Sequence, residues 1–195
     1  MWRYGLRSYV GRLSPQIASA DQLVVALILP MRELGLFVAG LALIGAPRLA
    51  VSAVALVAFP RASAGHHVGE RIPARQMLVL SMAAAVAFAL FAFVAARPVV
   101  GLLFGRSFGP AATVVQILAV GEIARSPHEV AIEFLRGIGR PGLTSVAEGA
   151  NWIVFCTFAV LGAKFGGLDG AAAGMSAASI VSLGAYSTAL KRRVR

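Results

Sequence analysis

The chain has 195 residues, of which 58% are hydrophobic and 13% are charged. A water-soluble domain carries about 25% charged and about 45–50% apolar residues, so this composition excludes a soluble globule. Intrinsic disorder is excluded as well, because disordered chains are poor in apolar residues. The net charge of +10 comes from 18 basic and 8 acidic residues. Because the basic residues lie between apolar runs, they indicate membrane topology and not nucleic-acid binding.

Six segments approach the length of about 20 mostly apolar residues that a membrane-spanning helix needs. Glycines and prolines separate them, as expected for the ends of helices. The sequence therefore predicts an all-α, polytopic membrane protein, a bundle of six transmembrane helices that forms a single domain over residues 1–195. The predicted spans cover residues 9–29, 33–59, 76–96, 110–135, 143–163 and 168–190.

Lysine and arginine are distributed unevenly between the alternate connections of these spans. One set of connections, which includes both termini, holds twelve of them and the other holds four, while Arg48 and Arg125 fall inside spans. Cytoplasmic loops carry the excess of basic residues, so this asymmetry predicts that both termini are cytoplasmic. The N-terminus has no uninterrupted apolar stretch before a small-residue cleavage site, so we expect no cleavable signal peptide.

Charged residues gather on one side of the fourth predicted span. At about 100° per residue, all five of them fall within an arc of about 80°. Such a stripe cannot face hydrocarbon, where a central charge costs at least about 2.5–3.5 kcal/mol. We expect it to line a hydrated cavity, although its lower half could simply emerge into the cytoplasm. Helical spacing allows the pairs Glu122–Arg125, Arg125–Glu129 and Glu133–Arg136.

The first predicted span carries a second polar stripe, which is long enough to line a hydrated path. Its members are Ser8, Arg12, Gln16, Ser19 and Gln22. Asp21 points in a different direction on the same helix. It is either a buried, paired carboxylate or a site for a proton or a cation.

Arg48 follows Pro47 in the middle of the second predicted span. An arginine at that depth needs water or an anionic partner. A phosphate group of a substrate is one candidate partner, and Asp21 or Glu122 is another. The residues expected to line the cavity are therefore Arg12, Gln16, Arg48, Glu122, Arg125 and Glu129, with Asp21 and Glu122 as candidates for ion coupling.

No pattern of an enzyme is found in the sequence. There is no glycine-rich phosphate loop, nucleophile elbow, HExxH motif or paired CxxC, so we expect no catalytic residues and no cofactor. His66 and His67 lack further ligands nearby, which argues against a metal site. The single cysteine, Cys156, lies in an apolar run and is expected to pack as a small hydrophobic residue.

The order of motifs resembles the C-terminal half of polysaccharide-biosynthesis flippases, the exporters of O-antigen and other lipid-linked oligosaccharides. These belong to the multidrug/oligosaccharidyl-lipid/polysaccharide transporter superfamily. The matching stretches include RYGLRSYVGRLSPQ near the start, AFPRAS, GLLFGRSFGPAATVVQILAVGE, FLRGIGRPGLT and FGGLDGAAAGMSAASIVS. The resemblance extends over nearly the whole chain and carries over no catalytic residue.

The resemblance implies a lobe of a transporter that flips polyprenyl-diphosphate-linked oligosaccharide across the bacterial cytoplasmic membrane, for example in lipopolysaccharide biosynthesis. Family members have two helical lobes and this chain supplies one, so we expect a second six-helix lobe as partner, from a separate chain or a homodimer. Alternating access requires one bundle to rock against another. Two alternatives stay open: a lobe of a cation-coupled multidrug exporter, and a non-transporting scaffold or truncated fragment.

Overall fold

The computed structural model describes residues 20–46, 48–49, 74–137 and 141–194, and within these ranges all regular structure is helical. The elements are α2 (Ala20–Ala26), a helix over residues 31–46, α4 (Ala74–Phe104), the short 3-10 helix η1 (Arg106–Phe108), α5 (Ala111–Gly137) and α6 (Pro141–Val194). The prediction of an all-α fold is therefore confirmed for the part of the chain that is described.

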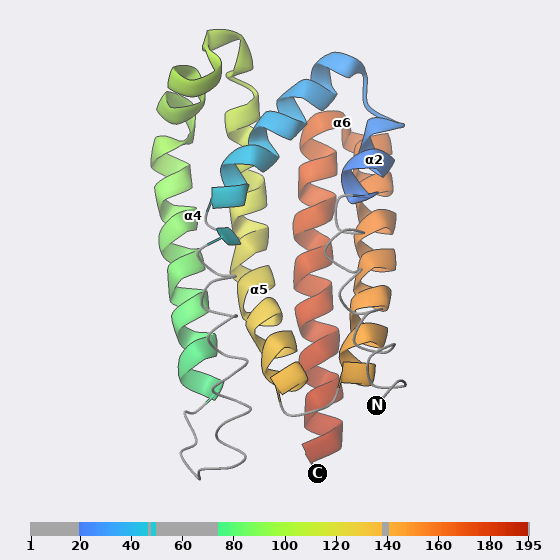
Figure 1. The fold of residues 1–195 in the computed structure, drawn as a ribbon. Helices are drawn as coiled ribbons and strands as arrows, with labels where there is room; N and C mark the ends of the chain where they lie inside the picture. Colours follow the sequence, from blue (N-terminus) through green and yellow to red (C-terminus); the bar gives the residue numbers. More distant parts are fainter. Residues whose placement is uncertain (1–19, 47, 50–73, 138–140, 195) are drawn as a thin grey trace.

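The long helix α6 is a hairpin of two antiparallel arms (Figure 1). Its backbone leaves the helical conformation at Gly167, where φ is 55° and ψ is −134°. A left-handed φ has no steric cost for glycine, which has no Cβ, so the pair Gly166–Gly167 is a suitable place for the reversal. This is the boundary that the sequence predicted between its fifth and sixth segments.

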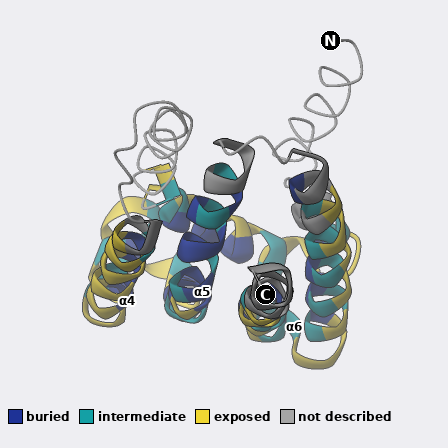
Figure 2. Ribbon diagram, turned by 90° about the horizontal axis from the view of Figure 1, so that it is seen from below, coloured by how far each residue is buried: buried dark blue, intermediate teal, exposed yellow. Residues whose placement is uncertain are grey.

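Seen end on, α4, α5 and the two arms of α6 stand in a row (Figure 2). Helix α4 packs on α5, and α5 packs on α6. The two arms of α6 approach each other very closely, because a Cβ atom built on Gly170 would overlap the carbonyl oxygen of Gly162, and one built on Gly174 would overlap that of Phe158. Glycine at these positions lets the two backbones meet, as small residues do in helix pairs of membrane proteins.

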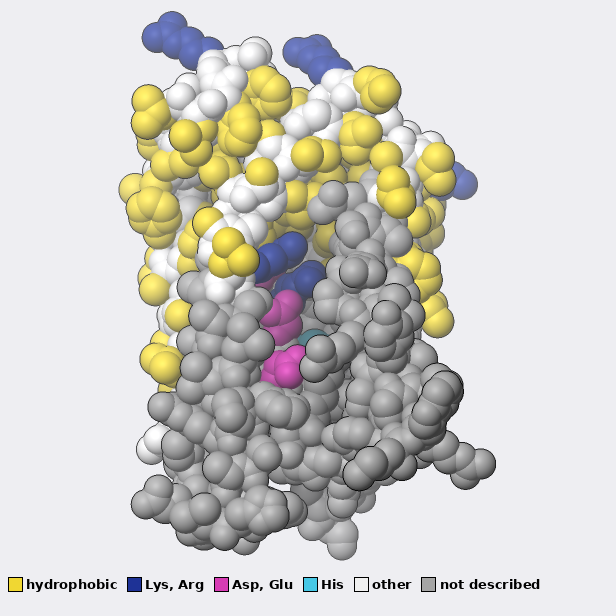
Figure 3. Space-filling view, viewed as in Figure 1, with side chains coloured by type: hydrophobic (Ala, Val, Ile, Leu, Met, Phe, Trp, Pro, Cys, Tyr) yellow, Lys and Arg dark blue, Asp and Glu magenta, His cyan; other side chains and the backbone are white. Residues whose placement is uncertain are grey.

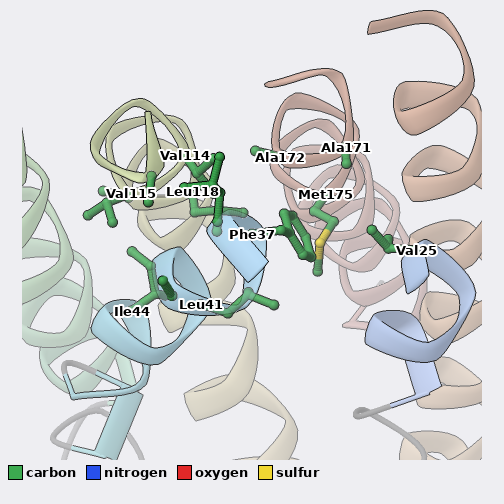
Figure 4. Packing of buried hydrophobic residues seen from close by; sticks show 14 of the residues in the cluster. Val25, Phe37, Leu41, Ile44, Val114, Val115, Leu118, Ala171, Ala172 and Met175 are labelled. Atoms are coloured by element: carbon green, nitrogen blue, oxygen red, sulfur yellow. The ribbon is translucent and has the colours of Figure 1, made fainter. Parts of the chain in front are cut away.

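The helix over residues 31–46 crosses the row and closes the apolar core (Figure 4). Its buried residues Phe37 and Ile44 share one cluster with Val114 of α5 and Met175 of α6. At Gly40 the helix comes so close to α5 that an added Cβ would lie 2.7 Å from Cγ1 of Val114. This core holds the crossing helix on α5 and thereby positions the residues that follow it.

Large hydrophobic side chains cover much of the outer surface of α4 and α6. Those of α4 include Leu90, Phe91, Phe93, Val94 and Leu102, and those of α6 include Ile153, Leu161, Phe165, Ile180 and Val181. Two stretches of the described chain, Leu78–Phe104 and Glu148–Gly184, are long and apolar enough to cross a membrane. The second stretch contains the bend at Gly167 and so comprises both arms of the hairpin.

The structure does not show the six transmembrane helices that were predicted. Helix α5 is not one of the two apolar stretches, because Glu122, Arg125, Glu129 and Glu133 make its second half polar. The predicted fifth and sixth spans form the single apolar stretch of α6. The first two predicted spans extend over residues 9–19 and 50–59, which lie outside the described residues, as does His66–His67.

Candidate functional site

An ion pair joins the residues after the crossing helix to the middle of α5. Nε of Arg48 donates a hydrogen bond to Oε1 of Glu122 at 2.8 Å, and Nη2 of Arg48 lies 2.7 Å from the same oxygen. The side chain of Arg48 is 25% exposed and that of Glu122 is 7% exposed. The carboxylate is therefore shielded, whereas the side chain of Arg48 is partly exposed.

A second ion pair lies one turn further along α5. Nε of Arg125 donates a hydrogen bond of 3.0 Å to Oε1 of Glu129, four residues on. The guanidinium carbon of Arg125 also lies 5.5 Å from the ring centre of Phe155 on α6, within the range of a cation–π interaction. Arg125 therefore connects α5 to the first arm of the α6 hairpin.

Together Arg48, Glu122, Arg125 and Glu129 form what we call the four-charge cluster. Figure 3 shows basic and acidic side chains meeting at mid-height on one face, below a broad area of hydrophobic side chains. Ser126 and His128 are buried on the same stretch of α5. The cluster holds two formal positive and two formal negative charges, so it is neutral as a whole.

The structure brings together four of the six residues that were predicted to line a cavity. Arg48 pairs with Glu122, which was one of the alternatives left open, and the predicted pair Arg125–Glu129 is confirmed. The helical spacing also allowed the pair Glu122–Arg125, but the structure pairs Glu122 with Arg48, and Arg125 binds Glu129 and lies against Phe155. The partner of Glu122 comes from another segment of the chain, which the spacing within one helix does not reveal.

The remaining predicted residues lie outside the described part of the structure. Arg12 and Gln16 precede it, and the backbone of Asp21 belongs to α2 while its side chain is not described. The same holds for the side chain of Arg136, so its predicted pair with Glu133 stays a prediction. Among the described residues, no group of three or more His, Cys, Asp and Glu side chains could hold a metal ion.

Phe155 is the member of the site that sequence reasoning missed. An aromatic residue within an apolar run carries no signal of contact with a charge. A weak signal exists in the helical spacing, because Phe155 shares a helix face with Glu148 and Asn151, seven and four residues earlier. Glu148 and Asn151 are partly exposed, and Phe155 is buried and lies against Arg125 of α5.

Comparison of the chain with protein-family models, with curated proteins and with solved structures gives no match. The resemblance to flippases described above therefore stays a prediction. What the structure adds is the arrangement of helices and the geometry of the four-charge cluster.

Proposed function

We propose that this chain is one helical lobe of a membrane transporter that flips polyprenyl-diphosphate-linked oligosaccharide across the bacterial cytoplasmic membrane. The observation that carries the proposal is the four-charge cluster, which lies among helices whose outer surfaces are apolar. Charged side chains between apolar helices mark the path of a polar substrate in membrane proteins. Two guanidinium groups at such a place can bind a diphosphate through charge-assisted hydrogen bonds.

The outer surface supports a position in the bilayer. Leu90, Val94 and Leu102 of α4 are 65%, 83% and 85% exposed, which would be unfavourable in water. In a bilayer the same side chains contact lipid, while the lipid tail of the substrate stays outside the bundle. The proposed orientation places both chain termini in the cytoplasm, as the distribution of basic residues predicts.

A second lobe is part of this proposal. The row of helices in Figure 2 forms one bundle, and alternating access needs two bundles that move against each other. The partner is a separate chain or a second copy of this one. A scaffold or a truncated fragment would have the same apolar surface, and it differs from the transporter only in lacking transport.

The test is a strain in which the gene for this chain is deleted. We expect lipid-linked glycan to accumulate on the cytoplasmic side of the membrane, and the intact gene to restore its export. Unchanged glycan export in the deletion strain would contradict the proposal.

The same strain tests the alternative of a cation-coupled multidrug exporter, which the two carboxylates Glu122 and Glu129 favour. A cationic drug prefers an acidic cavity, and its efflux would then depend on these residues. Loss of efflux of a cationic dye, with glycan export intact, would support the exporter and overturn the flippase.

A further inference from the structure

The four-charge cluster is already neutral before any substrate arrives. Each of its guanidinium groups is matched by one carboxylate, at 2.7 Å for Arg48–Glu122 and 3.0 Å for Arg125–Glu129. Adding an anion of two or more negative charges would leave the cluster strongly negative. In a site shielded from water, such an excess of charge is costly unless a carboxylate is neutralised or moves into water.

The two carboxylates differ in their ability to move into water. The side chain of Glu129 is 31% exposed, so it can leave Arg125 and remain hydrated and ionised. The side chain of Glu122 is 7% exposed, and it loses its ion-pair partner when Arg48 turns to another anion. A shielded carboxylate without a cation favours its protonated form.

Access to the cluster also differs between the two partners. Arg48 has the more exposed side chain of its pair, so it is the more accessible of the two partners. Both Nε and Nη2 of Arg48 are engaged by the single oxygen Oε1 of Glu122. The same two nitrogens form an edge that can hold two oxygens of a phosphate group.

We propose that the carboxylate of Glu122 occupies the anion site of Arg48 until substrate binds. A diphosphate then displaces this carboxylate from Arg48, and the displaced Glu122 takes up one proton from water. This inference rests on the proposed function and names the coupling within that site. The hydrogen bonds from Nε and Nη2 pass from Oε1 of Glu122 to oxygens of the anion. The proton adds to the released carboxylate, and no covalent bond of the anion breaks.

The other charged groups that act on Arg48 are Arg125 and Glu129. Arg48 comes from the segment before α4, and Arg125, His128 and Glu129 lie on α5 itself. Helix α6 contributes Glu148 on the face that carries Phe155. Arg97, the charged residue of α4 whose side chain is described, is exposed.

The experiment measures binding of inorganic pyrophosphate to the purified chain by isothermal titration calorimetry. Titrations in buffers of different ionisation enthalpy give the number of protons taken up for each anion bound. Methanedisulfonate is the second probe, because its two charges do not titrate near neutral pH. We compare the native chain with Glu122→Gln and Arg48→Ala, and use Asp169→Asn and Arg106→Ala as controls at exposed positions.

For the native chain we expect uptake of about one proton for each anion, and binding that weakens as the pH rises because the proton is a co-ligand. Glu122→Gln should abolish this uptake and tighten binding, since the competing carboxylate is gone. Arg48→Ala should weaken binding about tenfold or more. Both control variants should behave like the native chain.

Two results with methanedisulfonate, which carries no titrating group of its own, would overturn the inference: binding without proton uptake, or uptake that persists in Glu122→Gln. Failure of the inference is distinguishable from failure of the proposed function. If pyrophosphate binds with the expected proton uptake but the deletion strain still exports glycan, the exchange stands and the flippase is wrong. If glycan export depends on the chain but no proton is taken up, the flippase stands and the exchange is wrong.

Discussion

The side chain of Arg48 is more exposed than that of Glu122. This difference decides which of the two substitutions lowers the free energy of unfolding more. Glu122 is almost completely shielded, whereas a quarter of the Arg48 side chain is exposed. Removing one partner of a shielded ion pair is destabilising mainly because the other charge stays behind without compensation. Loss of Glu122 is therefore less destabilising than loss of Arg48, because the Arg48 side chain that remains is partly exposed to water.

The first prediction is therefore an asymmetric double-mutant cycle. Arg48→Gln should lower the free energy of unfolding by about 2–3 kcal/mol, because it leaves the shielded carboxylate of Glu122 without a cation. Glu122→Gln should cost less, about 1 kcal/mol, and the double variant should recover part of the loss. Thermal unfolding of the purified variants in detergent measures all three, with Asp169→Asn as an exposed control. Additive losses, or a larger loss in Glu122→Gln, would contradict the asymmetry.

At this scale the sequence predicts local contacts better than distant ones. The pair Arg125–Glu129 follows from helical spacing alone. The pair Arg48–Glu122 joins residues 74 positions apart, so the sequence could offer it only as one alternative among several. The contact of Arg125 with Phe155 depends on how α6 packs on α5, which a pattern within one helix does not contain.

The α6 hairpin depends on close contact between its two arms. A Cβ atom added at Gly170 would overlap the backbone carbonyl of Gly162, whereas one added at Gly149, on the same helix, meets no atom within 4 Å. The neighbour is backbone and not a flexible side chain, so the arms themselves would have to separate.

The second prediction follows from this pair of glycines. Gly170→Ala should lower the free energy of unfolding by at least about 1–3 kcal/mol, as overpacking does elsewhere. Gly149→Ala should be neutral or stabilising by up to about 1 kcal/mol, because alanine is the better helix former. Thermal unfolding of the two variants measures the difference. Equal stability of the two variants would show that the arms are not in this contact.

The third prediction concerns the docking of the helix over residues 31–46 on α5. A Cβ at Gly40 would lie 2.7 Å from Cγ1 of Val114, so Gly40→Ala should destabilise the protein. Combining it with Val114→Ala should restore part of the loss, since the truncated side chain makes room. Gly35→Ala is the matched control, because a Cβ there meets no atom within 4 Å. If the double variant is as unstable as the sum of the single ones, the helix does not pack there.

The ends of helices were predicted correctly where an apolar run ends at glycine, and less well where it contains proline. The reversal of α6 falls at the predicted glycine pair. Helix α4 was expected to end at residue 96, but it continues through Pro98 to Phe104 and ends before Gly105, whose φ is 87°. Pro98 removes the hydrogen bond to the carbonyl of Val94 only, and the apolar residues that follow keep the helix intact.

At the scale of the whole molecule, the proposed orientation in the membrane depends on which elements lie at each end of the row of helices. The 3-10 helix η1 and the bend of α6 lie at the same end, and the C-terminus lies at the opposite end (Figure 1). A composition rich in apolar residues predicts insertion in a membrane, but it does not count helices. Helix α5 shows why: the sequence predicted it as the fourth span, but its charged half excludes it from the two stretches that are apolar enough to cross a membrane, although it packs between α4 and α6.

The fourth prediction tests this orientation by thiol labelling of intact cells. In a Cys156→Ala background, cysteine at Ser107 or at Lys164 should react with an impermeant reagent, because both positions are exposed and belong to the end expected outside. Cysteine at Ser63, in the segment predicted to be cytoplasmic, should react only after the cells are opened. Labelling of Ser63→Cys but not of Ser107→Cys in intact cells would reverse the orientation.

The most direct test of the central claim is glycan export by variants of Arg48 in the deletion strain. If Arg48 binds the diphosphate of the substrate, Arg48→Ala should abolish export, and Arg48→Lys should restore it in part, because lysine keeps the charge but loses the planar fork. Arg97→Ala, which removes an exposed arginine of α4, should export normally. With equal amounts of each variant in the membrane, normal export by Arg48→Ala would contradict the claim.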